Sequence, residues 1–195
     1  RGQRRAAGRH PGAEGVRALL QKLYLDMLDV QHTMGKPTIS AVSGAARGGG
    51  MTLSITCNVI VADESATFGY PELDNGLIPA IHFVHLPRVI GKHRAFDLLF
   101  TGRSFDAHEA ERIGLVARVA KGKGVMDCAM ELAESFARQP PRATKIAHAN
   151  FMRAQDMDFR REVADVTETF INVSQTEETQ AGLAAFAEKR TPPWR

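Results

Sequence analysis

The chain has 195 residues, of which 44% are hydrophobic and 24% charged, and its formal net charge is +3 at pH 7. This balance is typical of a globular protein with a sizeable core and argues against disorder over most of the length. No apolar run approaches the roughly 20 residues that a membrane-spanning helix needs. The two cysteines are too few for a disulfide framework and fit a reducing compartment, so we expect a soluble, cytoplasmic protein.

The positive charge is concentrated at the start of the chain, where the first nine residues hold four arginines and no acidic residue. Such an arm can contact nucleic acid, a membrane surface or an acidic ligand. However, no aromatic residue stands between the arginines, and Pro11 and the glycines interrupt regular structure. We predict a solvated basic arm or loop over residues 1–13, with nucleic-acid or membrane binding as the less favoured alternative.

The first half of the chain alternates between predicted helices and strands. Apolar residues at three- and four-residue steps predict a helix from Glu14 to the break at Gly35-Lys36-Pro37. Residues 38–43 predict a strand that runs into a glycine turn, residues 51–57 a buried helix, and residues 58–62 a second strand. This order of strand, glycine turn, helix and strand is typical of a βαβ unit.

The second half is predicted to be mostly helical. A short strand at 67–70 precedes a loop at 71–79, and Leu115–Val119 form the last predicted strand. Asp106 and Glu109 have the spacing of a capping box at the start of a helix. The other predicted helices span 81–90, 92–99, 125–139, 143–157, 159–173 and 176–189, the last three following a break at Pro140-Pro141.

Three consecutive glycines, Gly48 to Gly50, stand between the first predicted strand and the buried helix. Glycine lets the backbone approach a ligand and adopt positive φ, and the next helix begins with free N–H groups and the positive end of its dipole. Such a turn can bind a phosphate or stabilise an oxyanion that forms during a reaction. It matches neither a P-loop nor a Rossmann fingerprint, and close packing is the commoner use of a glycine turn.

A second candidate for chemistry is the loop at 71–79, where Glu72 and Asp74 stand among apolar residues, prolines and a glycine. Burial raises the pKa of a carboxyl group and prepares it for proton transfer near neutral pH. The alternative is that both acids are exposed or cap the next helix. The residues of the loop alone leave this choice open.

Several blocks of sequence resemble one known family. KPTISAVSGAARGGG spans residues 36–50, and ATFGYPE, GLIP and LFTGR follow at 66–72, 76–79 and 99–103. A closing segment at 176–192 completes the order. On these motifs the chain resembles the crotonase (enoyl-CoA hydratase/isomerase) superfamily over almost its whole length.

The resemblance implies an α/β fold with a crotonase-like ββα spiral core over residues 1–120, including the basic arm 1–13, and a C-terminal helical trimerisation region over 121–195. Family members are longer, and their N-terminal strands have no counterpart here, so we expect a fragment or a chain whose beginning was left out. The resemblance also implies an acyl-CoA thioester substrate and a homotrimer or hexamer. It implies no cofactor beyond the coenzyme A of the substrate, and no metal.

In this family two backbone N–H groups polarise the thioester carbonyl, and the glycine block matches Gly49 to the second of them. One such donor is typically worth about 3 kcal/mol, and the first would lie upstream of this chain. Hydratases of the family also use two glutamates. The first of these positions is Thr52 here, and the second is Glu72. A threonine can orient water but cannot act as a base near neutral pH.

One carboxylate is enough for double-bond isomerisation, because it can take a proton from one carbon and return it to another. Hydration would need help from Asp74 or a second use of Glu72. The resemblance therefore implies an acyl-CoA-processing enzyme of the enoyl-CoA hydratase/isomerase type, with Glu72 as acid/base. A Δ3,Δ2-enoyl-CoA isomerase rather than a true hydratase, and a non-catalytic acyl-CoA-binding protein, are the alternatives.

The resemblance also suggests residues around the substrate. In related proteins the C-terminal helix carries an aromatic residue and a lysine near the coenzyme A, and Phe186 and Lys189 match this pattern. Core packing for Phe186 and a solvated charge for Lys189 are equally good interpretations. Arg47 is expected to face nucleotide phosphates or solvent. His82 is an auxiliary acid–base candidate. With His85 it has a zinc-like spacing, but no third ligand follows. The predicted substrate-binding residues are Gly48, Thr52, Pro79, Ala80, His82, Phe186 and Lys189.

Overall fold

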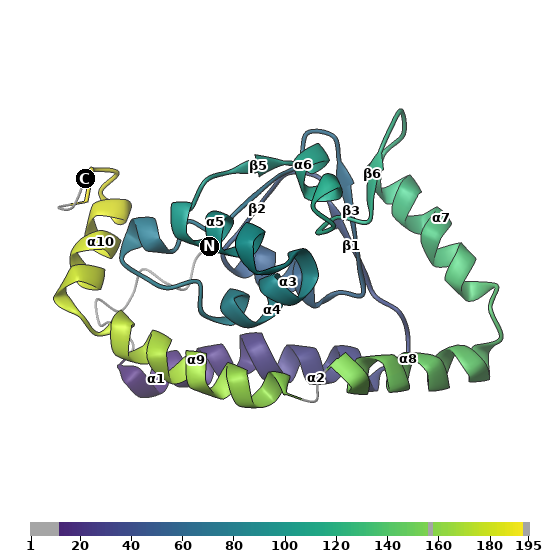
Figure 1. Cartoon of the computed structure of the whole chain (residues 1–195), viewed down its shortest axis with the longest axis horizontal. Coiled ribbons are helices and arrows are strands. Elements are labelled where there is room, and N and C mark those ends of the chain that lie inside the picture. Colours follow the sequence, from purple (N-terminus) through teal and green to yellow (C-terminus); the bar gives the residue numbers. More distant parts are fainter. Residues whose placement is uncertain (1–11, 156–157, 193–195) are drawn as a thin grey trace.

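The computed structural model describes residues 12–155 and 158–192. The predicted basic arm lies almost wholly outside the described residues, and Ala13 already belongs to the first helix. Figure 1 shows strands and short helices above a layer of long helices drawn from both ends of the chain. The fold is mixed α/β, as predicted, while the division at residue 120 stays a prediction.

The predicted N-terminal helix is confirmed and consists of α1 (Ala13–Leu20), the π-helical segment η1 (Gln21–Asp26) and α2 (Met27–Thr33). Its buried apolar residues follow a four-residue repeat, which drifts around an α-helix of 3.6 residues per turn. The wider π-helical turns offset this drift. The residues kept inside are Val16, Leu20, Tyr24 and Leu28.

The first sheet contains the predicted βαβ unit. Its strands β1 (Ile39–Val42), β3 (Val59–Asp63) and β6 (Arg118–Ala120) are parallel and lie in the order β1-β3-β6. The crossover between β1 and β3 carries helix α3 (Gly49–Thr56). Strand β6 is shorter than predicted and begins three residues later, because Leu115 and Val116 bond back to Ala110 at the end of the preceding helix.

A second sheet was predicted only in part. It pairs β4 (Thr67–Gly69) with β2 (Ala45–Arg47) in parallel and with β5 (Phe105–Asp106) in antiparallel orientation. The prediction of a short strand near 67–70 is confirmed, whereas the assignment of 44–50 to a turn was wrong for β2. Its residues Ala-Ala-Arg have no strand pattern of their own, and only pairing with the distant β4 makes them extended.

Three α-helices lie between β4 and β6 along the chain. α4 (Ala80–Ile90) and α5 (Lys92–Thr101) follow the loop that contains the 3-10 turn η2 (Leu73–Asn75). α6 (Ala107–Arg112) begins at the predicted cap, where the Asp106 carboxylate accepts a hydrogen bond from the Glu109 N–H. These three helices carry the chain from the second sheet back to β6.

The C-terminal helices are α7 (Val125–Ala137), α8 (Pro141–Gln155), α9 (Phe159–Ser174) and α10 (Glu177–Ala187). Helix α8 begins at Pro141, two residues before the predicted start at 143. Proline is tolerated at the first helical position because its missing N–H would have no intrahelical partner there. In Figure 1, α8 and α9 lie along α1 and α2, and α7 flanks the first sheet. No helix within the described ranges is both long and apolar enough to cross a membrane.

Helix α4 separates the two larger hydrophobic clusters. Leu86 and Ile90 face the cluster of the sheets, α3 and α5, whereas Ile81 and Val84 face the N-terminal helix and α9. The N-terminal end of α4 therefore lies where both clusters meet. The candidate site is at this junction.

Candidate functional site

The glycine turn forms the start of α3. Gly48 is the N-cap, with φ 51° and ψ −119°, a conformation that favours glycine. Gly49 and Gly50 follow as the first helical residues, and a Cβ added at either would meet nothing within 4 Å. Their N–H groups precede the first intrahelical bond, which runs from Thr52 N to Gly48 O at 3.1 Å. The turn thus presents backbone donors on an open side.

Glu72 lies beside this turn, near the start of the loop that follows β4 and directly before η2. Its Oε1 is 3.7 Å from the point where a Cβ on Gly48 would lie. Its Oε2 is buried and has no hydrogen-bond partner among the described residues. Burial raises the pKa of the Glu72 carboxyl above its ordinary value. The structure therefore brings the predicted acid and the predicted glycine turn together, with the carboxyl group prepared to carry a proton.

Thr52 of α3 and His82 of α4 form a buried pair next to the glycine turn. Thr52 Oγ1 and His82 Nε2 are 3.3 Å apart, and each residue is only 2% exposed. Burial lowers the pKa of His82 to about 4, so its imidazole is neutral near pH 7. Hydratases of the family have a glutamate at the position of Thr52. Here that position holds a neutral threonine next to a neutral histidine.

Two tyrosines complete the surroundings of Glu72, and the sequence argument assigned a role to neither. Burial, and to a smaller extent the Glu72 carboxylate, raise the pKa of the Tyr24 hydroxyl on η1. Tyr70 packs its ring edge-on against His82, with centroids 4.7 Å apart, and its buried hydroxyl has no partner among the described residues. Their signal was weak: the chain has only two tyrosines, both among apolar residues.

Asp74 occupies a different place from Glu72, although only two residues separate them. Its Oδ2 lies 3.5 Å from the point where a Cβ on Gly102 would be, at the turn after α5. The open choice in the loop is thereby resolved for these two acids. Glu72 belongs with the glycine turn, and Asp74 is directed at the Gly102 turn.

The remaining predicted site residues lie at the start of α4 and at the end of α10. Pro79 is the N-cap of α4 and Ala80 its first residue, both buried at the junction of the two clusters. Phe186 is 70% exposed at the end of α10, and Lys189 is exposed just beyond it. Neither is therefore packed in the core of this chain. Their contact with substrate stays a prediction.

Arg47 forms hydrogen bonds within the second sheet. Its guanidinium donates to the Ala46 carbonyl, to Thr67 Oγ1 at 3.2 Å and to Ser104 Oγ at 2.9 Å. These bonds join β2 to β4 and to the turn before β5. A contact with nucleotide phosphates stays a prediction.

The spacing of His82 and His85 is compatible with a pair of zinc ligands. Within residues 12–155 and 158–192 no cluster of three or more histidine, cysteine, aspartate or glutamate side chains could hold an ion. The spacing of His82 and His85 therefore lacks the further ligands that a zinc site needs.

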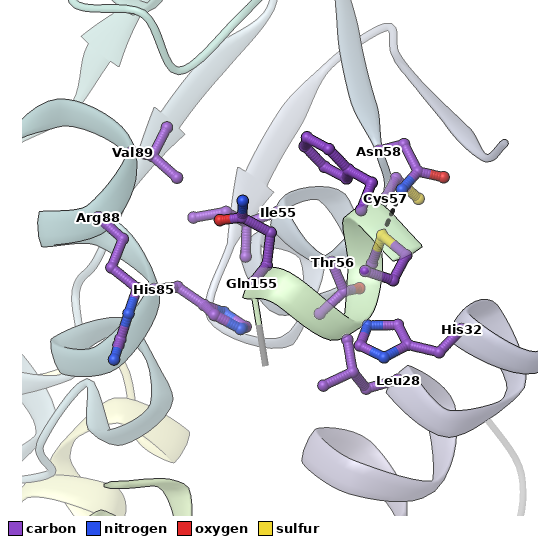
Figure 2. Close-up of a pocket in the computed structure, with 12 residues that line it drawn as sticks. Leu28, His32, Ile55, Thr56, Cys57, Asn58, His85, Arg88, Val89 and Gln155 are labelled. Carbon is purple, nitrogen blue, oxygen red and sulfur yellow. Dashed lines mark hydrogen bonds between the residues drawn. The ribbon is translucent and has the colours of Figure 1, made fainter. Parts of the chain in front are cut away.

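A cavity of about 210 Å³ lies at the opposite end of α3 from the glycine turn. Figure 2 shows His85 and Arg88 of α4 on one side and Leu28 and His32 of α2 on the other, with Cys57 at the end of α3. None of the predicted site residues lines it. The cavity is therefore separate from the Glu72 site.

The fold and the site define an α/β protein that sets helix N-terminal donors beside one buried carboxyl group. A family model described as enoyl-CoA hydratase/isomerase matches residues 6–195. The chain belongs to this family.

Named relatives agree. A "Probable enoyl-CoA hydratase" of Rhizobium meliloti is 39% identical over 156 residues, which cover 80% of this chain and 61% of that protein. The 2,3-dehydroadipyl-CoA hydratase of Escherichia coli is 34% identical over 161 residues, covering 82% of this chain and 63% of the relative. This chain thus spans about three fifths of the length of the curated relatives.

Solved structures give the same result for the fold. The enoyl-CoA hydratase/isomerase of Pseudoalteromonas atlantica superposes with a TM-score of 0.77 at 30% identity, covering 85% of this chain and 67% of that one. An enoyl-CoA hydratase from Mycobacterium avium also gives 0.77, at 27% identity, over 94% of this chain and 69% of its own. The predicted crotonase-type fold is confirmed.

Proposed function

We propose that the whole protein acts on an enoyl-CoA thioester and that Glu72 is its acid–base group. The observation that carries the proposal is the buried Glu72 carboxyl beside the free N–H groups of the glycine turn. A carboxyl group with a raised pKa exchanges protons near neutral pH, and backbone donors stabilise an oxyanion. Family membership supports the acyl-CoA thioester as the substrate class.

The reaction then divides between two groups. The Gly49 N–H donates to the thioester oxygen as negative charge develops there. Meanwhile the Glu72 carboxylate removes a proton from C2 of a 3-enoyl thioester. The electron pair moves through the C3–C4 double bond, and Glu72 returns the proton to C4. The product is the 2-enoyl thioester, and the enzyme is unchanged.

Between isomerisation and hydration, the single carboxylate favours a Δ3,Δ2-type isomerisation. Thr52 and His82 are neutral, so this side of the site offers no strong base for water. The names of the relatives favour hydration instead, which would require Glu72 to activate water and also to protonate C2. A non-catalytic acyl-CoA-binding protein is the third candidate, and nothing observed favours it.

The test follows the products of the full-length protein. We would incubate it with a 3-enoyl-CoA, monitor the acyl group by NMR, and run a Glu72→Gln variant in parallel. The proposal predicts a 2-enoyl product that stays unhydrated and forms only with Glu72. Conversion to the 3-hydroxyacyl-CoA would establish a hydratase, and no conversion by either protein would leave acyl-CoA binding alone.

The remaining family properties are proposals for the whole protein. We propose coenzyme A recognition that includes Phe186 and Lys189, a homotrimer or hexamer assembled through the C-terminal helices, and a cytoplasmic location. The 70% exposure of Phe186 is what a subunit contact or a ligand contact needs. Sedimentation of the full-length protein as a stable monomer would contradict the assembly.

A further inference from the structure

We infer that Thr52 and His82 are positioning residues that hold the Gly48–Gly49 peptide and thereby aim the Gly49 N–H at the thioester oxygen. This inference rests on the proposed function, because it gives the neutral pair a task in the same site. The resemblance suggests both residues as substrate-binding residues, which stays a prediction. In the structure they are in hydrogen-bonded contact with each other, and Thr52 contacts the glycine turn.

The first step concerns the geometry of a peptide unit. The carbonyl of Gly48 and the N–H of Gly49 belong to one planar group, and the described chain contains no cis peptide. In a trans peptide these two bonds point in opposite directions. Whatever holds the Gly48 carbonyl therefore also sets the direction of the Gly49 N–H.

The second step identifies what holds that carbonyl. Gly48 O accepts from the Thr52 N–H at 3.1 Å and from Thr52 Oγ1 at 3.5 Å. His82 Nε2 lies 3.3 Å from Thr52 Oγ1. A neutral imidazole with its proton on Nε2 donates to this hydroxyl, which in turn donates to Gly48 O.

The third step shows why the turn needs such a support. Gly48 and Gly49 have no side chains to fix them, and a Cβ on Gly49 would meet nothing within 4 Å. The hydrogen bonds to the Gly48 carbonyl therefore fix the orientation of this peptide. His82 can act as a fixed support, because it is 2% exposed and the Tyr70 ring packs against it. Misplacement of a catalytic group by about 1 Å can cost about a hundredfold in rate.

The test compares two variants of His82 of similar volume. His82→Gln keeps an N–H donor near the place of Nε2, whereas His82→Leu removes it. His148→Leu is the matched control, because His148 is also a buried histidine with one hydrogen bond, to Asn58, but lies on α8. We expect kcat to fall about tenfold or more in His82→Leu, with KM nearly unchanged, and to stay within about threefold in the other two.

A spectroscopic readout separates positioning from packing. Difference infrared spectra of bound hexanoyl-CoA report the polarisation of its carbonyl, and we expect the shift to lower frequency to shrink in His82→Leu alone. The pH dependence of kcat keeps the same acid and base limbs in every variant that turns over. An altered limb in His82→Gln would assign His82 to proton transfer, and an unchanged carbonyl band in His82→Leu would overturn the positioning role.

The inference can also be tested without turnover. The Gly48 carbonyl and Gly49 amide resonances of the full-length protein should move in His82→Leu and stay near their wild-type positions in His82→Gln. If these resonances stay at their wild-type positions in His82→Leu, the inference is wrong even for an active enzyme. If they respond but wild-type protein neither binds nor converts an acyl-CoA, the proposed function fails instead. Should His82→Leu not fold, Thr52→Val removes the hydroxyl from the pair and should move the same resonances by less.

Discussion

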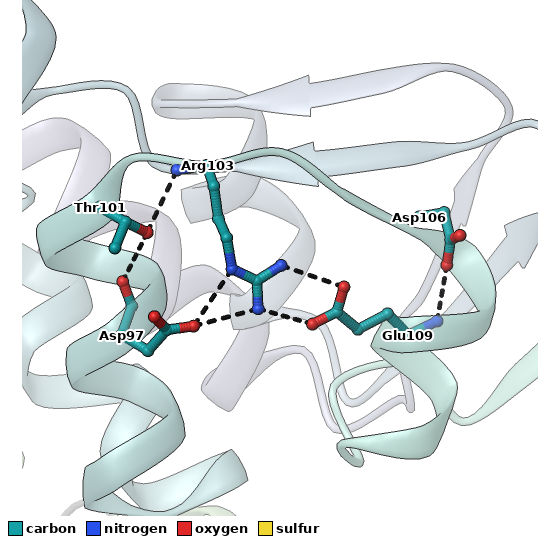
Figure 3. Close-up of polar contacts among 5 residues, drawn as sticks. All are labelled: Asp97, Thr101, Arg103, Asp106 and Glu109. Carbon is teal, nitrogen blue, oxygen red and sulfur yellow. Dashed lines mark hydrogen bonds and ion pairs between the residues drawn. The ribbon is translucent and has the colours of Figure 1, made fainter.

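Two clusters of charged and polar side chains, one around Arg103 and one around Glu72, differ in how their hydrogen bonds are satisfied. In the first, Arg103 donates from Nε and Nη2 to Asp97 at 3.1 and 3.0 Å, and from Nη1 and Nη2 to Glu109 at 3.1 and 2.7 Å (Figure 3). Both acids are thus bound to one guanidinium. Arg103 lowers the pKa of Glu109 and is itself kept charged.

The second cluster surrounds the glycine turn and is unsatisfied. Glu72 Oε2, Tyr70 Oη and His82 Nδ1 are buried, and each has no hydrogen-bond partner among the described residues. The pKa of Glu72 is raised by burial, the reverse of what Arg103 does to Glu109. A buried polar atom without a partner is costly and rare in folded proteins.

The contrast distinguishes a polar cluster that stabilises the fold from one that fits a role in the reaction. In the Arg103 cluster, which is partly exposed, the guanidinium bonds to the carboxylates of Asp97 on α5 and Glu109 on α6 and so joins the two helices. In the Glu72 cluster three buried polar atoms have no partner among the described residues. This is the environment that the proposed function requires of a carboxyl group that exchanges protons with a substrate. The predictions below change one cluster at a time.

The largest expected effect is on turnover in Glu72→Gln. Because general acid–base catalysis contributes about a hundredfold to ten-thousandfold, kcat should fall by that amount. Steady-state kinetics with an enoyl-CoA measure this loss. The melting temperature should not fall, because glutamine keeps the shape of glutamate without a buried charge. A variant that loses stability together with activity would place Glu72 in the structural class.

Gly48→Ala should disturb the same cluster through the backbone. At φ 51° and ψ −119° an alanine is strained, and such a strain costs about 1–3 kcal/mol of unfolding free energy. Urea denaturation measures it. Gly50→Ala is the matched control, because its φ is not positive and its Cβ meets nothing, so a slight gain in stability is expected. Equal losses in both variants would contradict the account of the turn.

Arg103→Leu should affect stability and leave catalysis intact. The cluster is partly exposed, so we expect a loss of about 1 kcal/mol in the free energy of unfolding, with kcat unchanged. Arg138→Leu is a control for replacing an exposed arginine at the end of α7. A drop in kcat in Arg103→Leu would contradict the claim that the Arg103 cluster acts on stability alone.

The smallest effects are on pH dependence, and they have opposite signs. Glu72 binds its proton more tightly when folded, so the wild type loses stability as pH rises from the ordinary glutamate pKa through the raised one. Glu109 binds its proton more weakly when folded, so its contribution is lost as pH falls through the lowered pKa. The stability difference from wild type should therefore grow as pH rises in both variants, but with opposite sign: Glu72→Gln becomes more stable than wild type and Arg103→Leu less stable. The same sign in both variants would contradict these pKa directions.

Local patterns predicted much of the fold, because the elements concerned have sequence signals of their own. The four-residue repeat from Val16 to Leu28, the glycines before α3 and the Asp106 cap each specify a local geometry. Strands β2 and β5 have no such signal, because pairing with a strand far along the chain creates them. The π-helical segment η1 likewise depends on the tertiary packing of Tyr24.

The site was predictable where the resemblance supplied a motif. Gly49 and Glu72 were matched in this way, and the structure places the glycine turn beside Glu72. The contact between Thr52 and His82 was not predictable, since 30 residues separate them and neither residue type requires the other. Tyr24 was missed because an aromatic residue on an apolar helix face resembles ordinary core packing.

The central claim is that one carboxyl group performs both proton transfers, opposite a neutral pair. The most direct test uses a 3-enoyl-CoA deuterated at C2, with the full-length protein in ordinary water and early sampling by mass spectrometry and NMR. Because Glu72 is buried, part of the deuterium that it removes from C2 should return at C4 of the 2-enoyl product. A product with no deuterium at C4 from the first turnover onward, formed as fast by Glu72→Gln as by the wild type, would contradict the account.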